Sequence, residues 1–259
     1  MAISFGTVYQ GGRSTSSGGD IDLTVVATTV DSSLHAIIAL VGARMQGYVD
    51  PTPIGVSFDG TALTLLSAFQ RIFYTSGAGD EGELNLYYLR NPGALSGKNL
   101  VVNMANSSNN SSVAAIVFEA RGVDSSSEAN LFGTPASNGP ANGTSASVDV
   151  GSAAGQVVID LLGKVGGTGL TVGAGQTQLG TTQVTSWFDL SSSYEAGAAT
   201  VTMSWSWTTS VSKGIAGVSL KPGVVSQVKK ASGVDQASIK KFSGVTIATA
   251  KKISGVSNT

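Results

Sequence analysis

The feature that most constrains the fold is a succession of short segments rich in β-branched and aromatic residues, each followed by turn residues. Asp59-Gly60 separates the apolar segments 54–58 and 62–69. Asn91-Pro92-Gly93 follows the segment 84–89, LNLYYL. Such residues supply the unusual or fixed φ angles of tight turns, so they mark boundaries between strands. The sequence therefore predicts an all-β protein with few helices.

The order of these segments predicts three parts of the chain. Residues 1–19 form a Gly- and Ser-rich lead-in, 20–223 a β domain, and 224–259 a C-terminal repeat arm. About a dozen strands, with one long polar connection, predict a two-sheet antiparallel β-sandwich of jelly-roll type for the domain. The segment 156–163, QVVIDLLG, has the continuous apolar character of a strand that is buried on both faces.

The arm repeats one phrase, Lys-Lys-x-Ser-Gly-Val, three times at a constant step of eleven residues. Its candidate assembly residues are Lys229, Lys230, Gly233, Val234, Lys240, Lys241, Phe242, Gly244, Val245, Lys251, Lys252, Ile253, Gly255 and Val256. An eleven-residue period suits a right-handed helical supercoil, but each repeat would then place a glycine inside a helix at about 1 kcal/mol. The repeats favour short strands bent at each Ser-Gly, with a helix as the alternative.

Charge is distributed unevenly along the chain. Residues 229–259 hold six lysines and one acid, Asp235, a net charge of +5, so the rest carries −6 to reach −1 overall. A basic arm on an acidic body can dock on an acidic neighbour or on another copy. The arm has one aromatic residue, Phe242, and no arginine, so nucleic acid is not predicted as a partner.

Composition argues against several classes of function. The chain has no cysteine, which excludes disulfides and thiolate metal sites. Its single histidine, His35, lies inside an apolar strand segment, where a packing role is the simpler interpretation. The N-terminus lacks the pattern of a signal peptide, and no segment has the roughly 20 apolar residues that span a bilayer. The sequence predicts no catalytic residue, cofactor or metal ligand, and no membrane insertion.

Two groups of side chains support weaker alternatives. Asp80, Glu81 and Glu83 share a Gly-rich loop that could contribute oxygens to a Ca²⁺ ion, but the spacing of a dedicated calcium loop is missing. No pair of acids is singled out for glycoside hydrolysis. A glycan platform could be built from Trp205, Trp207, Tyr87 and Tyr88. The apolar residues that continue the face of the two tryptophans favour a core position for them instead.

Five segments in order resemble a β-sandwich domain that recurs in phage structural proteins and in bacterial secreted or surface proteins. They are GVSFDGTALTLL, LNLYYLRNPGAL, SSVAAIVFEARGVDSS, GQVVIDLLG and SKGIAGVSLKP, and the resemblance covers approximately residues 21–222. The Lys-Lys-x-Ser-Gly-Val repeats are similar to Gly-Val repeats at the ends of phage tail and other virion proteins. The shared motifs are structural, so the resemblance brings no catalytic residues.

The resemblance implies a non-enzymatic bacteriophage virion protein, synthesised in the host cytoplasm and associated with the tail or a fibre. Its implied partners are other virion proteins and sister subunits in a homo-oligomer, with host surface polysaccharide as a further candidate. A capsid decoration protein and a glycan-binding adhesin module are the alternative functions at this stage.

Overall fold

The chain forms two compact units in a computed structural model, the body at residues 2–222 and a C-terminal unit that begins at Gly223. The structure describes residues 2–15, 22–26, 35–47, 51–76, 81–92, 99–104, 110–184 and 187–223, and six two-residue strands between 230 and 257. All strands that it describes pair in antiparallel fashion, which confirms the predicted all-β class. None of the described helices is both long and apolar enough to cross a membrane.

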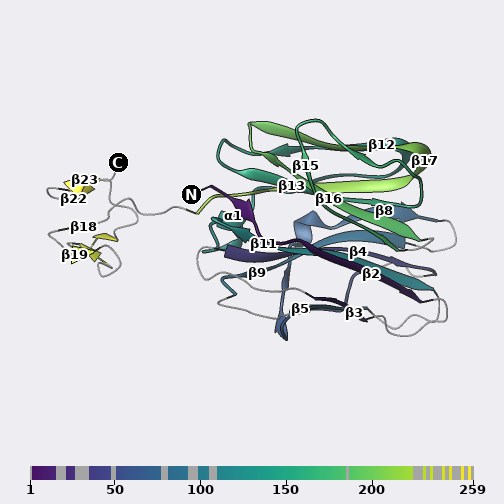
Figure 1. The fold of residues 1–259 in the computed structure, drawn as a ribbon, viewed down its shortest axis with the longest axis horizontal. Helices are drawn as coiled ribbons and strands as arrows, with labels where there is room; N and C mark the ends of the chain where they lie inside the picture. Colours follow the sequence, from purple (N-terminus) through teal and green to yellow (C-terminus); the bar gives the residue numbers. More distant parts are fainter. Residues whose placement is uncertain are drawn as a thin grey trace. The chain divides into compact units, whose positions relative to one another are not determined.

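The body contains three sheets, which we call the small, middle and curled sheets (Figure 1). The small sheet has the order β3 (Asp22–Val26), β10 (Asn99–Asn103), β5 (Gly55–Phe58) and β6 (Thr61–Ala62). The centre of the middle sheet is β11 (Ser111–Arg121), β4 (His35–Met45) and β9 (Glu81–Arg90). Its flanking strands are β1 (Ser4–Phe5) and β2 (Tyr9–Thr15), which pair with β11, and β7 (Thr64–Leu65) and β8 (Arg71–Thr75), which pair with β9.

The curled sheet has the order β12 (Ala136–Gly151), β17 (Thr200–Leu220), β13 (Val157–Lys164), β16 (Phe188–Ala196) and β15 (Thr177–Val184). The short strand β14 (Thr171–Val172) pairs with β17. The helical turns described in the body are η1 (Ser67–Phe69) and α1 (Glu128–Leu131), whose first turn is capped by the Ser127 hydroxyl. Strands β1 and β2 fall within the expected lead-in 1–19, so part of that segment belongs to the middle sheet.

The middle sheet is buried on both faces. Alternate residues of β4 contribute to two different cores, since Ile38 and Leu40 face one and Ile37 and Ala39 face the other. One core lies between the middle and small sheets, and the other between the middle and curled sheets. The prediction of a two-sheet sandwich is therefore wrong, because the described body has three sheets. A continuous apolar segment such as HAIIALV is typical of a strand that is covered on both faces. This segment therefore indicates a sheet on each side of β4.

The curled sheet encloses a third core of its own. The buried members of this core, including Val148, Leu162 and Trp205, all come from β12, β13 and β17. The register of β12 against β17 shifts twice, between Asn138 and Ala141 and between Gly143 and Ser145. Such bulges bend a strand and increase its twist, so the long ribbon curls into a half-barrel around its own apolar face.

One aromatic ring holds the middle and curled sheets together. Phe73 on β8 is fully buried and packs against glycines on three other strands. A Cβ atom at Gly82 or Gly163 would lie 2.6 or 2.7 Å from the Phe73 ring, and one at Gly214 would lie 2.7 Å from the Ile72 carbonyl oxygen. These positions need glycine because the ring and the backbone beside it occupy the space of a side chain.

Candidate functional site

The arm repeats form three antiparallel pairs of short strands. The pairs are β18 (Lys230–Ala231) with β19 (Val234–Asp235), β20 (Lys241–Phe242) with β21 (Val245–Thr246), and β22 (Lys252–Ile253) with β23 (Val256–Ser257). In each pair two residues of sequence, Ser-Gly, separate the strands. The candidates Lys229, Gly233, Lys240, Gly244, Lys251 and Gly255 lie outside the described residues. The described arm residues are thus extended and paired, not helical.

The three hairpins share one register. The variable residue of each repeat is the cross-strand partner of the constant valine: Ala231 with Val234, Phe242 with Val245, and Ile253 with Val256. The second lysine of each repeat pairs with the residue after that valine, so Lys241 is opposite Thr246. The same apolar pair and the same lysine position therefore recur three times.

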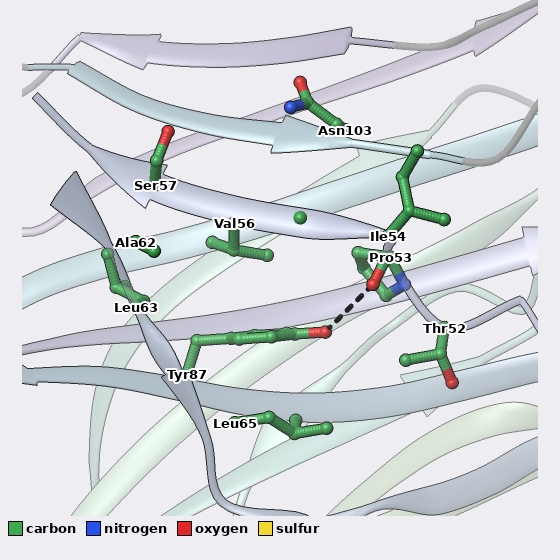
Figure 2. A pocket seen from close by; sticks show the side chains of 11 residues that line it. Thr52, Pro53, Ile54, Val56, Ser57, Ala62, Leu63, Leu65, Tyr87 and Asn103 are labelled. Carbon is green, nitrogen blue, oxygen red and sulfur yellow. Dashed lines mark hydrogen bonds between the residues drawn. The ribbon is translucent and has the colours of Figure 1, made fainter. Parts of the chain in front are cut away.

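The body carries an open groove at the edge between its small and middle sheets. The groove has a volume of about 390 Å³, and its walls come from β5 and β6 on one side and from Leu65 and Tyr87 on the other. Figure 2 shows the Tyr87 ring along the groove, with its hydroxyl 3.5 Å from the carbonyl oxygen of Pro53, to which it donates. Val56, Leu63 and Leu65 are among its apolar lining residues. This groove was not predicted from the sequence.

The rim of the groove carries an exposed hydrophobic side chain and two acidic residues. Ile54 is 70% exposed, and it is the one large hydrophobic side chain that is exposed among the residues the structure describes. At the same end, the Thr52 hydroxyl donates to the Glu83 carboxylate at 2.5 Å, and Gln70 donates to it at 3.2 Å. At the other end of β5, Asp59 is exposed in the turn to β6. The groove thus combines an apolar lining with acidic groups near both ends.

The four aromatic residues of the candidate glycan platform are interior residues. Trp205 and Trp207 are 2% and 5% exposed and belong to the core of the curled sheet, together with Val201 and Met203. Tyr87 and Tyr88 are 5% and 4% exposed and face opposite sides of the middle sheet. Trp205, Trp207 and Tyr88 pack within cores, and Tyr87 reaches the surface only as a wall of the groove. The core position of the two tryptophans, favoured by their neighbours in sequence, is confirmed.

The Tyr88 hydroxyl is part of a buried contact with α1. It donates to the Glu128 carboxylate at 2.5 Å, and its ring packs edge-on against Phe132. Burial, followed by the hydrogen bond to Glu128, raises the pKa of Tyr88 to about 12. This tyrosine therefore stays protonated and joins the middle sheet to the segment that leads into the curled sheet.

A buried carboxylate lies inside the curled sheet. Asp160 accepts from the Trp205 indole N–H at 2.7 Å, from the Ser193 backbone N–H at 2.6 Å and from the Ser193 hydroxyl at 3.0 Å. The side-chain oxygen of Gln176 lies 3.1 Å from the same hydroxyl, next to this network. Burial raises the pKa of Asp160 to about 7, although the three donors act in the opposite direction. The carboxylate has no opening to solvent, so its role is structural.

A second buried charge lies on the same strand. Lys164 forms an ion pair with Asp189, its direct cross-strand neighbour on β16. Its ammonium group also donates to the carbonyl oxygens of Gly166 and Gly167, at 2.7 and 3.1 Å. These three acceptors satisfy the hydrogen-bonding capacity of the buried ammonium group. Through them, Lys164 joins β13 to the loop that follows it and to β16. Sequence analysis missed both Asp160 and Lys164, because a polar residue in an apolar strand carries no sign of its partners.

The remaining candidates do not converge on a site. Asp80 lies outside the described residues, Glu81 is buried, and Glu83 is bonded to Thr52 and Gln70. His35 is the first residue of β4 and is buried, and neither of its ring nitrogens has a hydrogen-bond partner. In the part of the chain that the structure describes, His, Asp and Glu side chains form no cluster of three that could hold a metal ion.

Comparison of the chain with protein-family models, with curated proteins and with solved structures finds no match. The geometry of the arm and of the groove therefore carries the functional argument.

Proposed function

We propose that this protein is a non-enzymatic structural subunit of a larger assembly, in which the body folds by itself and the arm fastens it to its neighbours. The observation that carries the proposal is the threefold repetition of one hairpin with one register. An isolated two-stranded hairpin is marginally stable in water. Hairpins with two residues in each strand therefore gain most of their stability from the surface that they contact.

Repetition gives such an arm strength without a large interface. Three weak contacts on one chain act together, because binding of the first hairpin raises the effective concentration of the next by orders of magnitude. Lysine at the same position in every hairpin adds attraction to the body, whose net charge is −6. The neighbours that we propose are sister subunits and other proteins of the same assembly.

We further propose that the assembly is a bacteriophage virion and that the subunit is associated with the tail or a fibre. The support is the resemblance of the sandwich segments and of the arm repeats to phage structural and tail proteins. The sparse charge of the chain, 12% of residues, suits a surface that is covered in an assembly. The five resembling segments lie in all three sheets, since GQVVIDLLG and SKGIAGVSLKP supply parts of β13 and β17 of the curled sheet. The buried aromatic rings give no support to a glycan-binding function.

Stepwise shortening of the arm tests the proposal. Chains that end at Ala250, at Ile239 and at Gly223 lose one, two and three hairpins, while the body remains complete. We expect the association constant, measured by sedimentation equilibrium, to fall at each step and the circular dichroism of the body to stay unchanged. Equal association of all four chains would contradict the role of the arm.

A further inference from the structure

We propose that the groove between the small and middle sheets receives a repeat hairpin from the arm of a second copy of this chain, with Phe242 as its strongest anchor. The inference rests on the proposed function of the arm and adds the surface to which the arm binds. Three features of the described residues support it: the open edge beside the groove, the match of apolar groups, and the match of charge.

The groove lies beside an open strand edge. β6 is the last strand of the small sheet and pairs only with β5 among the described strands. An extended segment can add its backbone to such an edge while its side chains enter the neighbouring groove, as in other peptide-binding sheets. The two strands of each arm hairpin are extended and therefore have the conformation that this edge accepts.

The lining of the groove matches the apolar pair of the hairpin. A groove of about 390 Å³ lined by Val56, Leu63, Leu65 and Tyr87 has the size and character of a small apolar binding site. Exposed Ile54 at its rim is a large hydrophobic group that a partner would cover. Each hairpin offers one variable residue opposite one valine, and Phe242 is the largest variable residue of the three. Aromatic side chains, including Phe, are enriched in the buried centres of interfaces, so we expect the middle hairpin to bind most strongly.

Charge favours the same partner. Glu83 lies beside Thr52 at one end of the groove, and Asp59 lies at the other end of β5. The arm has a net charge of +5, and a lysine directly precedes the variable residue in each repeat. A hairpin whose apolar pair occupies the groove can therefore place its lysines close to acidic groups of the body.

The proposed role of the arm as a fastener favours a second copy over the arm of the same chain. Among the described residues of each chain this groove occurs once, whereas the hairpin occurs three times. An arm that folded back on its own body would fill that groove without joining two bodies. An arm that reaches another copy joins two bodies through one hairpin and leaves two hairpins for further contacts.

The absence of cysteine allows a direct test in the full chain. We would mix a chain carrying Ile54→Cys with a chain carrying Val245→Cys, which leaves Phe242 in place, and oxidise the mixture. The matched control replaces Ile54→Cys by Thr200→Cys, an exposed position on the curled sheet. A disulfide needs Cα atoms within about 7 Å, so docking should raise the yield of cross-linked dimer at least about tenfold over the control.

Cross-linking yields equal to the Thr200→Cys control would reject the groove as the binding surface. A chain carrying both Ile54→Cys and Val245→Cys tests the second copy. We expect covalent dimers and larger species from it. If the only product were a monomer with an internal disulfide, the arm would bind its own body, which would overturn the inference. The arm-shortening series separates the two proposals: association that depends on the arm without cross-linking would leave the function standing and reject the groove.

An independent variant tests the same contact without new thiols. Ile54→Lys places a positive charge at the rim of the groove, and its fold should be intact because residue 54 is 70% exposed. We expect it to weaken association about tenfold by repelling the lysines of the arm, whereas Thr200→Lys should leave association unchanged. Equal association of the two lysine variants would contradict the inference.

Discussion

The body and the arm stabilise their strands in opposite ways. In the body, β4 and β11 pair over eleven residues from His35 to Met45, and both are covered by other sheets on each face. In the arm, each described strand has two residues and one partner. Long strands with two buried faces form a self-sufficient core, whereas a short hairpin depends on an added surface. On the proposed function, folding belongs to the body and assembly belongs to the arm.

This comparison predicts that variants in the cores of the body change stability and leave the association of folded chains intact, and that variants in the arm do the reverse. The largest effect is expected at Phe73. Phe73→Ala removes the ring that fills the space above Gly82 and Gly163, and a buried Phe→Ala change costs about 3–5 kcal/mol. We expect the thermal midpoint to fall by roughly 6–20 °C, since each kcal/mol is worth about 2–4 °C in a domain of this size.

Phe73→Leu is the matched control, because leucine keeps most of the apolar contact. It should lose much less stability than Phe73→Ala when both are measured by calorimetry. A thermal midpoint of Phe73→Ala close to that of the parent chain would contradict the central place of this ring between the two sheets.

The second effect concerns the pH dependence of the body. Burial raises the pKa of Asp160 from 3.8 to about 7, so the folded state holds this proton more tightly than the unfolded state does. The stabilising contribution is therefore complete below about pH 4 and is lost as the pH rises towards 7. We expect the unfolding free energy of the parent chain, relative to Asp160→Asn, to fall by a few kcal/mol across this range, at about 1.4 kcal/mol per pKa unit.

The measurement is urea unfolding at a series of pH values, with Asp149→Asn as the control. Asp149 is an exposed acid of β12 whose partner is the Thr202 hydroxyl. Its replacement removes one exposed carboxylate and so controls for the loss of an acidic group as such. A constant difference between the parent chain and Asp160→Asn from pH 4 to 7 would show that Asp160 does not titrate there.

The smallest effect on stability is expected in the arm. Phe242→Ala should leave the thermal midpoint of the body unchanged, because residue 242 belongs to the other compact unit. Association should weaken by about tenfold or more, since removal of a hot-spot side chain costs about 2 kcal/mol or more and about 1.4 kcal/mol is tenfold. Ile253→Ala should weaken it less. Sedimentation equilibrium and calorimetry on the same samples check both expectations, and a lower thermal midpoint would contradict the separation of the two units.

Much of the local structure of the body could be predicted from the sequence. The turn expected at Asp59-Gly60 is present, with φ angles of 50° and 75° at its two residues and strands on both sides. The strand expected to be buried on both faces, 156–163, is β13, with a residue such as Ile159 in one core and Leu162 in another. These features depend on short-range patterns, which a sequence displays directly.

The arrangement of the sheets and the groove could not be predicted in the same way. The third sheet follows from pairings between distant segments, such as β12 with β17, and from bulges that leave no clear pattern in the sequence. The groove is formed where β6, Leu65 and Tyr87 meet, and Ile54 looks like an ordinary strand residue until its exposure is known. Asp160 and Lys164 carried no signal, because their partners Trp205 and Asp189 are 45 and 25 residues away.

The separation of folding from assembly is tested most directly by comparing the full chain with a chain that ends at Gly223. Size-exclusion chromatography with light scattering gives the mass of each, and calorimetry on the same samples gives the thermal midpoint. We predict that the full chain is a trimer or larger, that the shortened chain is a monomer, and that the two midpoints agree. A shortened chain that still associates, or that no longer folds, would contradict the account, and so would a full chain that is a monomer.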